Sequence, residues 1–499
     1  MRDDEEFSFV QLENDLHQHF AESVGLVSIQ NTRSLLLQQI DSHCSADNNL
    51  SINKPIVILG QVGCGKSALL ANWVRLRHNV ANDDSNIFYH AIGCSRLSSS
   101  VSHLLRRLEN WLMKQFHLND EIDLSSDDQL PWILPRLLDR ASKKNNAIIV
   151  LDGLNHLQQS SLRWLPSKLP PNIHIILSST STTDCIDLDA HLKPTSEHSM
   201  KEQVKIQQIC DEIARRDWPV LLMDALSEEN VRSIAAKHLS LHNDIEQRDE
   251  IVDSLCAHPK ATSPAFLTGM LSGLSNSSSS RGDMKQYVSC ENTTQLVELM
   301  LAQVQGFEVG NALSLLLVAR HGLKEDELYD LLRRMSNENP SFCDDDTKIL
   351  TDELCFVGVV IHDTKFGKLL TIPVNNITLR HVAWNKYITT SARESEVRAI
   401  IVDYFANKDP SLRYCEEFPW QQDKNNSPNL GQTLVDLRVV DIMFHSEALK
   451  DELFTFFSRL VASNNFDIVS YFNQSLQKWV VKSRPSSTQI SMMTCRRQR

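Results

Sequence analysis

Short hydrophobic runs alternate with longer amphipathic stretches between residues 51 and 226. The runs are four to six residues long and are bounded by Gly, Pro or Asn: Ile56–Leu59, Ile87–Ile92, Ala147–Leu151, Ile173–Leu177 and Val220–Met223. Runs of this length and composition are typical of buried parallel strands. The segments between them, residues 67–78, 99–116 and 129–143, are long enough for crossover helices. The pattern therefore predicts a five-stranded α/β domain over residues 51–226.

The strand pattern stops after residue 226. Ser227 precedes two acidic residues, which is a helix N-terminus signal, and residues 227–286 read as a helical lid domain. Between residues 287 and 390 the order is helix, turn, helix and then two strand-like runs (356–361 and 369–372), the order of a winged-helix domain. The remaining segments are a helical lead-in (1–50), a C-terminal helical region (391–482) and a basic tail predicted to be disordered (483–499).

Composition narrows the function classes. The formal net charge of −13 opposes general binding of nucleic acid or anionic membranes. No apolar run approaches the roughly 20 residues that span a bilayer, and the acidic start has no signal-peptide core. The 11 cysteines include no C-x-x-C pair, so zinc sites and a disulfide framework are not expected. We expect a cytoplasmic multidomain protein.

Residues 60–67 read Gly-Gln-Val-Gly-Cys-Gly-Lys-Ser and match the P-loop pattern G-x-x-x-x-G-K-[ST], between a predicted strand and a predicted helix. Glycines let successive backbone N–H groups point inward at phosphates, and the helix N-terminus adds positive potential. The lysine reaches the β- and γ-phosphates, and the serine hydroxyl is an oxygen ligand for Mg²⁺. The expected ATP or ADP contacts are Gly60, Gln61, Val62, Gly63, Cys64, Gly65, Lys66, Ser67 and Ala68.

Asp152 ends the hydrophobic run at residues 147–151, and with Ser67 it is our candidate magnesium ligand. A strand between the P-loop strand and the Asp152 strand indicates a P-loop ATPase sheet, for which we expect the order 2-3-1-4-5. The turn after Asp152 holds Asn155 and His156 instead of a carboxylate. Asn155 can orient a water but cannot accept its proton, so slow or absent hydrolysis is expected. Ser179 is either a γ-phosphate sensor or the start of a loop.

Several stretches resemble a known family. They are residues 60–73, 88–95, 162–170, 174–178, 404–405 and 417–421, the last reading Glu-Phe-Pro-Trp-Gln. Together they resemble signal-transducing NTPases of the STAND class with a NACHT domain, most closely the nephrocystin-3 group. The resemblance implies that Pro264 packs near the adenosine and that His381, in the winged-helix domain, touches the β-phosphate of ADP. A proline that opens a helix explains Pro264 equally well, and for His381 packing beside apolar residues is the more common explanation of a lone histidine.

The resemblance also implies a regulatory switch that binds ATP or ADP with Mg²⁺, controls protein assembly and acts in ciliary signalling. The chain lacks the myristoylation signal, coiled coil and tetratricopeptide repeats of that group, so we expect it to be the NTPase core. Protein partners would bind through the C-terminal helices or through repeats absent here, and self-association stays open.

Two other functions remain alternatives. One is a turnover ATPase that remodels its partners with an arginine finger, for which Arg96 and Arg163 are candidates. The other is a scaffold of the kind seen in telomerase-associated and WD-repeat NACHT proteins. A nucleic-acid regulator is disfavoured because the predicted helix at 324–334 is rich in acidic residues.

Overall fold

A computed structural model of the chain describes most of its residues. The described ranges are 13–22, 33–45, 53–79, 86–95, 97–118, 130–181, 197–240, 248–276, 286–304, 307–335, 344–364, 367–373, 376–446, 449–464 and 467–482. They fall into two compact units, which we describe separately: one within residues 8–313 and 341–387, the other within residues 314–340 and 388–499. The predicted basic tail (483–499) and Arg96 lie outside the described residues.

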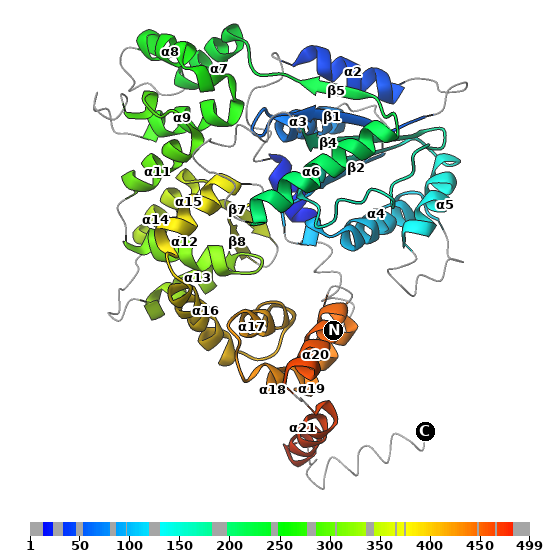
Figure 1. The fold of residues 1–499 in the computed structure, drawn as a ribbon, viewed down its shortest axis with the longest axis vertical. Helices are drawn as coiled ribbons and strands as arrows, with labels where there is room; N and C mark the ends of the chain where they lie inside the picture. Colours follow the sequence, from blue (N-terminus) through cyan, green and yellow to red (C-terminus); the bar gives the residue numbers. More distant parts are fainter. Residues whose placement is uncertain are drawn as a thin grey trace. The chain divides into compact units, whose positions relative to one another are not determined.

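The first unit is built on a parallel sheet (Figure 1). Its strands are β1 (Ile56–Gly60), β2 (Asn86–Ala91), β3 (Ala147–Asp152), β4 (Ile173–Thr180) and β5 (Val220–Met223). All five predicted strands are confirmed. Every residue of β3 and β4 is buried, as expected of central strands covered on both faces.

The strand order corrects our expectation. The order is β2-β3-β4-β1-β5, so the predicted order 2-3-1-4-5 is wrong in the exchange of β1 and β4. Strand β4 pairs with β1 on one side and with β3 on the other. We assigned positions in the sheet from the order of the strands along the chain. A crossover connection allows a later strand, here β4, to enter between two earlier ones, β3 and β1. The polar end of β4 consequently lies between the P-loop strand and the Asp152 strand.

Helices cover both faces of this sheet. One face packs against α4 (Val101–Gln115), α5 (Leu130–Ser142) and α6 (Glu197–Arg215). The other packs against α2 (Ser34–Ser45), α3 (Lys66–Asn79) and the helix over residues 13–22. In that last helix His17 Nδ1 accepts a hydrogen bond of 3.0 Å from the backbone N–H of Ala91, at the edge strand β2.

Helices continue the first unit after β5. They are α7 (Glu228–Ser240), α8 (Arg248–Ala257), α9 (Pro264–Asn276), α11 (Thr293–Gln303), α14 (Asp344–Phe356) and α15 (Ile377–Tyr387). Strands β7 (Val360–Thr364) and β8 (Gly367–Thr371) form an antiparallel hairpin. The predicted strand at 356–361 begins too early, because α14 extends to Phe356 and Gly358, at φ +104°, ends the helical conformation.

The second unit is mainly helical. Helix α12 (Phe307–Val318) crosses the division between the units; the elements after it in the second unit are β6 (Leu323–Lys324), α13 (Glu325–Met335), α16 (Ser391–Ala406), α17 (Leu412–Lys424), α18 (Leu430–Leu434), α19 (Leu437–His445), α20 (Lys450–Asn464) and α21 (Ile468–Lys482). Helix α17 lies within the segment predicted to be helical as a whole, but Pro419 interrupts its own pattern, so the sequence did not define it as a separate helix. The six-segment division from the sequence stays a prediction. Among the described residues, no helix is both long and apolar enough to cross a bilayer.

Candidate functional site

The loop between β1 and α3 is the P-loop recognised in the sequence. Lys66 is the first residue of α3, and its Nζ donates hydrogen bonds to the carbonyl oxygens of Gly60 (2.8 Å) and Gln61 (2.6 Å). The lysine side chain therefore folds over the loop that precedes it. Cys64 is buried and Val62 is half exposed, so the loop shows one side to the core and the other to solvent. Gly65 (φ +96°) leads into the helix, and Ala68 is buried one residue past the motif.

Asp152 lies at the end of β3 inside a set of hydrogen bonds. Its Oδ1 accepts 2.5 Å from the hydroxyl of Ser178, and its Oδ2 accepts 3.2 Å from the hydroxyl of Tyr89. The Ser178 hydroxyl also accepts 2.8 Å from the backbone N–H of Gly153. These contacts are possible because β3 has β2 and β4 as its neighbours. The carboxylate is thus held in one orientation from both adjacent strands.

Burial raises the pKa of Asp152 above its ordinary value. Hydrogen bonds from Ser178, Ser67 and Tyr89 and the charge of Lys66 act in the opposite direction without cancelling the effect of burial. A divalent cation would favour the ionised carboxylate strongly. The Ser67 hydroxyl and the Asp152 carboxylate are adjacent hard oxygen donors, so the residues present fit Mg²⁺.

Ser178 and Tyr89 bond to the candidate magnesium ligand Asp152, and our sequence analysis proposed neither as a site residue. Ser179, the expected sensor, is fully buried, and its hydroxyl has no hydrogen-bond partner among the described residues. Ser179 lies on the same face of the sheet as Leu177, the face covered by α4, α5 and α6. Ser178 lies on the opposite face, where it contacts Asp152. Strand alternation could have found Ser178, since Asp152 belongs to the face of the P-loop helix.

The first turn of α9 lies against the P-loop. The backbone N–H of Ala265 donates a 3.1 Å hydrogen bond to the carbonyl of Gly63, and the hydroxyl of Ser263 is 3.5 Å from the same oxygen. Gly63 has φ +77°, and a Cβ there would stand 3.0 Å from that of Ala265. Only a glycine allows both the left-handed turn and this close approach. Pro264, the first residue of α9, is therefore next to a direct contact with the loop.

Asn155 and His156 occupy the short 3-10 turn η3 (Leu154–His156) directly after β3. Asn155 is buried, and its side-chain Nδ2 lies 3.1 Å from His156 Nε2. Since the amide nitrogen can only donate, Nε2 accepts and the neutral imidazole carries its proton on Nδ1. Burial lowers the pKa of His156 to about 4, and the positive charges of Lys205 and Lys66 add to the effect.

In the described part of the structure, no contact links His381 to the P-loop, Asp152 or the η3 turn. It is exposed on α15, and its Nε2 lies 3.0 Å from the side-chain nitrogen of Asn385. Its expected contact with ADP stays a prediction.

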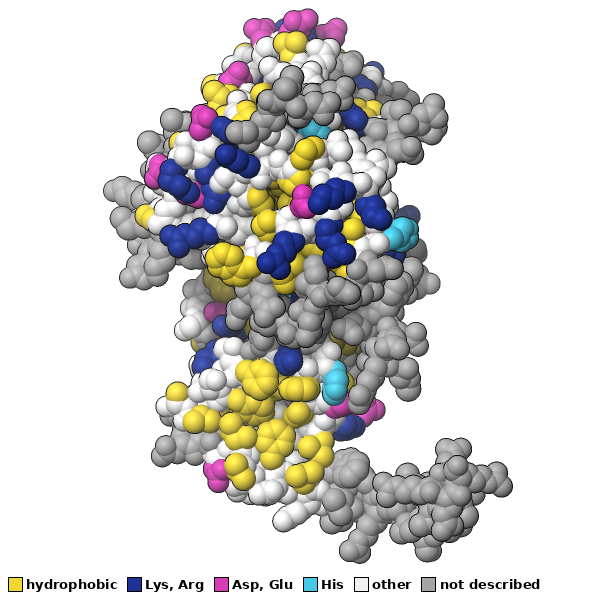
Figure 2. Space-filling view, turned by 90° about the vertical axis from the view of Figure 1, so that its right-hand side faces the viewer, with side chains coloured by type: hydrophobic (Ala, Val, Ile, Leu, Met, Phe, Trp, Pro, Cys, Tyr) yellow, Lys and Arg dark blue, Asp and Glu magenta, His cyan; other side chains and the backbone are white. Residues whose placement is uncertain are grey.

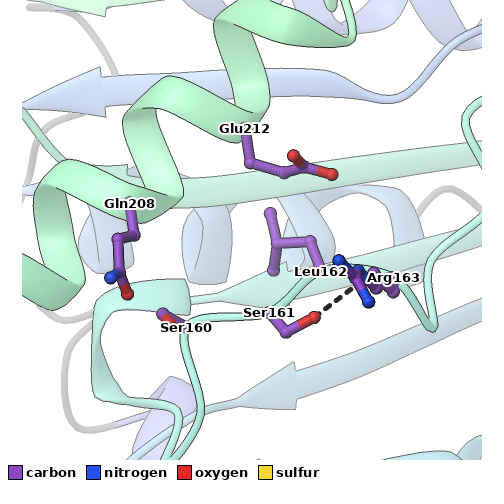
Figure 3. Close-up of a pocket in the computed structure, with 6 residues that line it drawn as sticks. All are labelled: Ser160, Ser161, Leu162, Arg163, Gln208 and Glu212. Carbon is purple, nitrogen blue, oxygen red and sulfur yellow. Dashed lines mark hydrogen bonds between the residues drawn. The ribbon is translucent and has the colours of Figure 1, made fainter.

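An open pocket of about 300 Å³ lies between α6 and the chain that follows η3 (Figure 3). It is lined by Ser160, Ser161, Leu162, Arg163, Gln208 and Glu212. The guanidinium groups of Arg215 and Arg216 hold Glu212 and lower its pKa to about 2. Arg163 is exposed, and none of the P-loop residues lines this pocket, so it is separate from the nucleotide-type site.

Comparison with known proteins supports the resemblance found in the sequence. Mouse nephrocystin-3 is 25% identical over 419 residues, which cover 78% of this chain and 28% of the mouse protein. Human nephrocystin-3 is 23% identical, over 77% of this chain and 28% of its own length. A TPR repeat-containing protein of Dictyostelium discoideum is 21% identical over 79% of this chain and 24% of its length. The chain thus spans about a quarter of the length of these relatives. No family model matches it.

Solved structures give distant likenesses. A Walker-type ATPase of Pyrococcus abyssi is 14% identical with a TM-score of 0.33, over 71% of this chain and 96% of the ATPase. Cdc6p of Pyrobaculum aerophilum is 12% identical with a TM-score of 0.32, over 71% and 94%. The sheet and the loop geometry above carry the fold assignment: this chain has a P-loop NTPase fold and is similar to nephrocystin-3 over most of its length.

Proposed function

We propose that this chain is a nucleotide-dependent switch: it binds ATP or ADP with Mg²⁺ at residues 60–68, and the bound nucleotide controls protein assembly. The observation that carries the proposal is the hydrogen bond from Ala265, at the start of α9, to Gly63 in the P-loop. Phosphates that bind the backbone of this loop fix the Gly63 peptide, so nucleotide binding and the docking of α9 share one structural element. Because both depend on the Gly63 peptide, a bound nucleotide can shift α9 between two arrangements relative to the P-loop.

The donors for the nucleotide come from three elements. Lys66 and the loop N–H groups hold the phosphates, and Lys66 exchanges its two backbone carbonyl partners for phosphate oxygens. Ser67 and Asp152 hold Mg²⁺, which supplies electrostatic stabilisation of the phosphates. Tyr89 and Ser178 orient Asp152. In the ADP state, His381 contacts the β-phosphate and Pro264 packs near the adenosine.

We expect hydrolysis to be slow or absent, which suits a switch better than a motor. The turn after Asp152 carries Asn155 and His156 rather than a carboxylate that could accept a proton from water. Burial, together with the positive charges of Lys205 and Lys66, lowers the pKa of His156 to about 4, which weakens it as a base.

The output surface in this proposal is the C-terminal helical region. Several large apolar side chains are exposed on α19, α20 and α21: Phe444, Phe454, Val461, Val469 and Leu476. Figure 2 shows hydrophobic side chains gathered in its lower half. Exposed apolar area of this kind marks contact with other proteins or with further helical repeats. Curated relatives include proteins named for tetratricopeptide repeats. By the resemblance to nephrocystin-3, we place this action in the cytoplasm and at the cilium.

Hydrogen exchange over α9 tests the switch. We would compare the wild type without nucleotide, with ADP and with ATPγS, and repeat the series with Lys66→Ala. The proposal predicts that ADP and ATPγS protect the first turn of α9 to different extents, and that Lys66→Ala removes both effects. Equal exchange in all three states, with nucleotide binding shown independently, refutes the switch and leaves a passive nucleotide site.

Ala265→Pro sharpens this test. It removes the N–H that donates to Gly63, at a helix position where proline is tolerated. The matched control, Ala265→Ser, keeps the N–H. Loss of nucleotide-dependent protection in the proline variant alone attributes the coupling to this hydrogen bond.

A further inference from the structure

Residues 130–172, which form α5, β3 and the connection to β4, differ in charge from the chain as a whole. They contain six Lys or Arg residues and two acidic ones, whereas the whole chain has 50 Lys or Arg and 63 Asp or Glu. The six cationic side chains are all exposed: Arg136, Arg140, Lys143, Lys144, Arg163 and Lys168. Of the two acids, Asp152 is buried at the candidate magnesium site and Asp139 is exposed. This part of the first unit therefore presents a basic surface on an acidic protein.

The cationic residues of α5 lie on the side of the helix that faces solvent. The opposite side packs into the core beside the sheet through Ile133, Leu134, Leu137, Leu138 and Ala141. Trp132, Arg136 and Arg140 are exposed at intervals of four residues, and Asp139 and Lys143 lie on the same side of the helix. We call these five residues the α5 stripe. At about 1.5 Å per residue, it is about 16 Å long.

The two ends of the α5 stripe differ in chemistry. At its start Trp132 is 81% exposed, the largest fraction for a large apolar side chain in the described part of the chain, and Pro135 is exposed as well. Towards its end, Lys143 Nζ donates a 2.6 Å hydrogen bond to Asp139 Oδ2. Figure 2 views the side of the first unit on which Figure 1 draws α5, and Lys and Arg side chains gather there among hydrophobic ones. The stripe is thus apolar at one end and basic over the rest.

Contacts with the β3–β4 connection hold the stripe in place. The side-chain Nδ2 of Asn172, directly before β4, donates 3.2 Å to the carbonyl of Ser142, the last residue of α5. Leu165 and Leu169 of the same connection belong to the core that contains Leu137. A surface on a packed helix loses little conformational freedom when a partner binds, which favours its use as a docking site.

We propose that the α5 stripe is a docking surface for an acidic polypeptide segment of another protein. An apolar side chain of the partner packs on Trp132 and Pro135, and its carboxylates pair with Arg136 and Arg140. Arginine binds a carboxylate through two parallel hydrogen bonds, and Trp and Arg are residue types that often dominate the binding energy of protein interfaces. No residue of the stripe belongs to the P-loop, so this docking does not depend on the proposed nucleotide function.

Two features favour a polypeptide segment over a nucleic acid or an anionic bilayer. A bilayer or a DNA duplex is larger than the stripe, so it also faces the surrounding surface of a protein with a net charge of −13, whereas a short segment meets the stripe alone. Asp139 lies in the middle of the stripe, where a continuous array of phosphates would repel it. A polypeptide can place a neutral side chain at that point.

Peptide selection on the full chain tests this docking surface. Random peptides of about 12 residues, long enough to follow the stripe as a helix, are displayed on phage and selected for binding to the wild type. Peptides that also bind Arg136→Glu/Arg140→Glu are removed. We expect the remaining sequences to be rich in Asp and Glu and to share an aromatic or aliphatic residue at one end. Absence of such sequences overturns the proposal.

Fluorescence anisotropy of one selected peptide, labelled with fluorescein, then tests residues that took no part in the removal step. Trp132→Ala should weaken binding by about tenfold, because the apolar contact is lost. The matched control is Leu35→Ala on α2, where the leucine is 73% exposed, and it should keep the wild-type affinity. Equal affinity for the wild type and Trp132→Ala, with thermal unfolding unchanged, overturns the proposed contact.

A second control separates local from general charge. Lys237→Glu/Lys348→Glu makes the same change of net charge as Arg136→Glu/Arg140→Glu, at exposed lysines of α7 and α14. The selected peptide should bind this control within about twofold of the wild type, because charges farther away than about 8 Å are screened at physiological ionic strength. Loss of binding in this control would show a general charge effect and overturn the proposal.

Other occupants of the stripe give different results. Binding of phosphatidylserine vesicles or of a DNA duplex that Arg136→Glu/Arg140→Glu abolishes, with no acidic peptide selected, overturns the assignment to a polypeptide. Residues 119–129 contain five acidic and no basic residues. Selection on a variant in which these five are Asn or Gln should yield the same peptides as the wild type. Acidic peptides obtained from that variant alone would show that the chain covers its own stripe and overturn the proposal of a separate partner.

Discussion

Two buried polar clusters, one in each unit, show how differently the same kinds of side chain are used. In the second unit, Arg413 donates to Glu327 at 2.9 Å and to Glu417 at 3.1 Å, and Glu417 is fully buried. Burial opposes the charge of Glu327, but the charge and hydrogen bonds of Arg413, together with Lys324, outweigh it, so the pKa of Glu327 lies below its ordinary value. Gln421 Nε2 also donates to Glu417, at 2.7 Å. These charges find their partners inside the protein.

The P-loop cluster in the first unit pairs its charges less completely. Lys66 donates to backbone carbonyls of its own loop rather than to a carboxylate, and Asp152 is bonded to hydroxyl groups. Burial dominates the pKa of Asp152, whereas ion pairing dominates that of Glu327. A cluster closed on itself stabilises a fold, while a cluster with exchangeable neutral partners can accept a charged ligand.

The largest effect expected from this contrast is a loss of stability when the buried cluster of the second unit, around Arg413 and Glu417, is disrupted. We call it the closed cluster. Glu417→Ala leaves Arg413 and Gln421 short of a buried partner and should cost about 3–5 kcal/mol of unfolding free energy. Chemical denaturation monitored by tryptophan fluorescence measures it. The surface variant Asp253→Ala, which removes an exposed pair with Arg232, is the control and should change stability by less than about 1 kcal/mol. A loss for Glu417→Ala as small as that of the control would contradict the comparison.

The second largest effect is a loss of nucleotide affinity when the P-loop cluster of the first unit is changed. Lys66→Ala should weaken binding of ATP and ADP by roughly 100-fold, because the charge-assisted contact of the lysine with the phosphates is lost. The unfolding free energy without nucleotide should stay close to that of the wild type, since the lysine bonds only to its own loop. Titration with a fluorescent nucleotide, beside denaturation of the same sample, gives both numbers. A large loss of stability would place Lys66 with the closed cluster instead.

A third, smaller effect concerns pH. Burial raises the pKa of Glu13, in the helix over residues 13–22, to about 7, while Arg107 and a hydrogen bond from Ser95 act against it. The folded pKa of Glu13 lies above its unfolded value. The contribution of Glu13 to the free energy of unfolding is therefore fully present below about pH 4.5 and is lost as the pH rises through 7. Between pH 5.5 and 7.5 the loss should be about 2 kcal/mol. Hydrogen exchange over the helix measures it, and Glu13→Gln should remove the dependence.

The smallest effect separates two adjacent serines of β4. Ser178→Ala removes a hydrogen bond to Asp152 and should weaken magnesium-dependent nucleotide binding by roughly tenfold. Ser179→Ala, on the opposite face of the strand, should leave it unchanged. Nucleotide titrations with Mg²⁺ and with EDTA check this. The reverse result would restore Ser179 as the sensor expected from the sequence.

The sequence was sufficient to predict the strands of the sheet and the P-loop, because burial on both faces produces hydrophobic runs and phosphate binding requires glycines at fixed spacing. Strand order was not predictable from these runs, since β4 contacts β1 and β3 through pairings distant along the chain. The same reason hid Ser178 and Tyr89. Strand alternation places Ser178 on the face of Asp152, but its contact with Asp152, like that of Tyr89, also depends on which strands are neighbours.

Helix α17 shows a different limit. Its residues 417–421 are recognisable as a family feature, but Pro419 and four buried polar residues, Glu416, Glu417, Gln421 and Gln422, give no amphipathic period. Polar residues at core positions are read as loop or surface unless their partners are known. Gln421 shows why: its Nε2 donates to the carbonyl of Val318 in α12 and its Oε1 accepts from Arg398 in α16, and both partners are distant along the chain.

The hydrogen bond from Ala91 to His17 also has a practical consequence. Strand β2 forms one margin of the sheet, and the helix over residues 13–22 occupies a donor that another polypeptide could otherwise use. A shortened protein starting at Arg33 would leave this margin open to addition of a foreign strand. Such a product should self-associate even with every phosphate-binding residue intact, so its assembly would say nothing about nucleotide control.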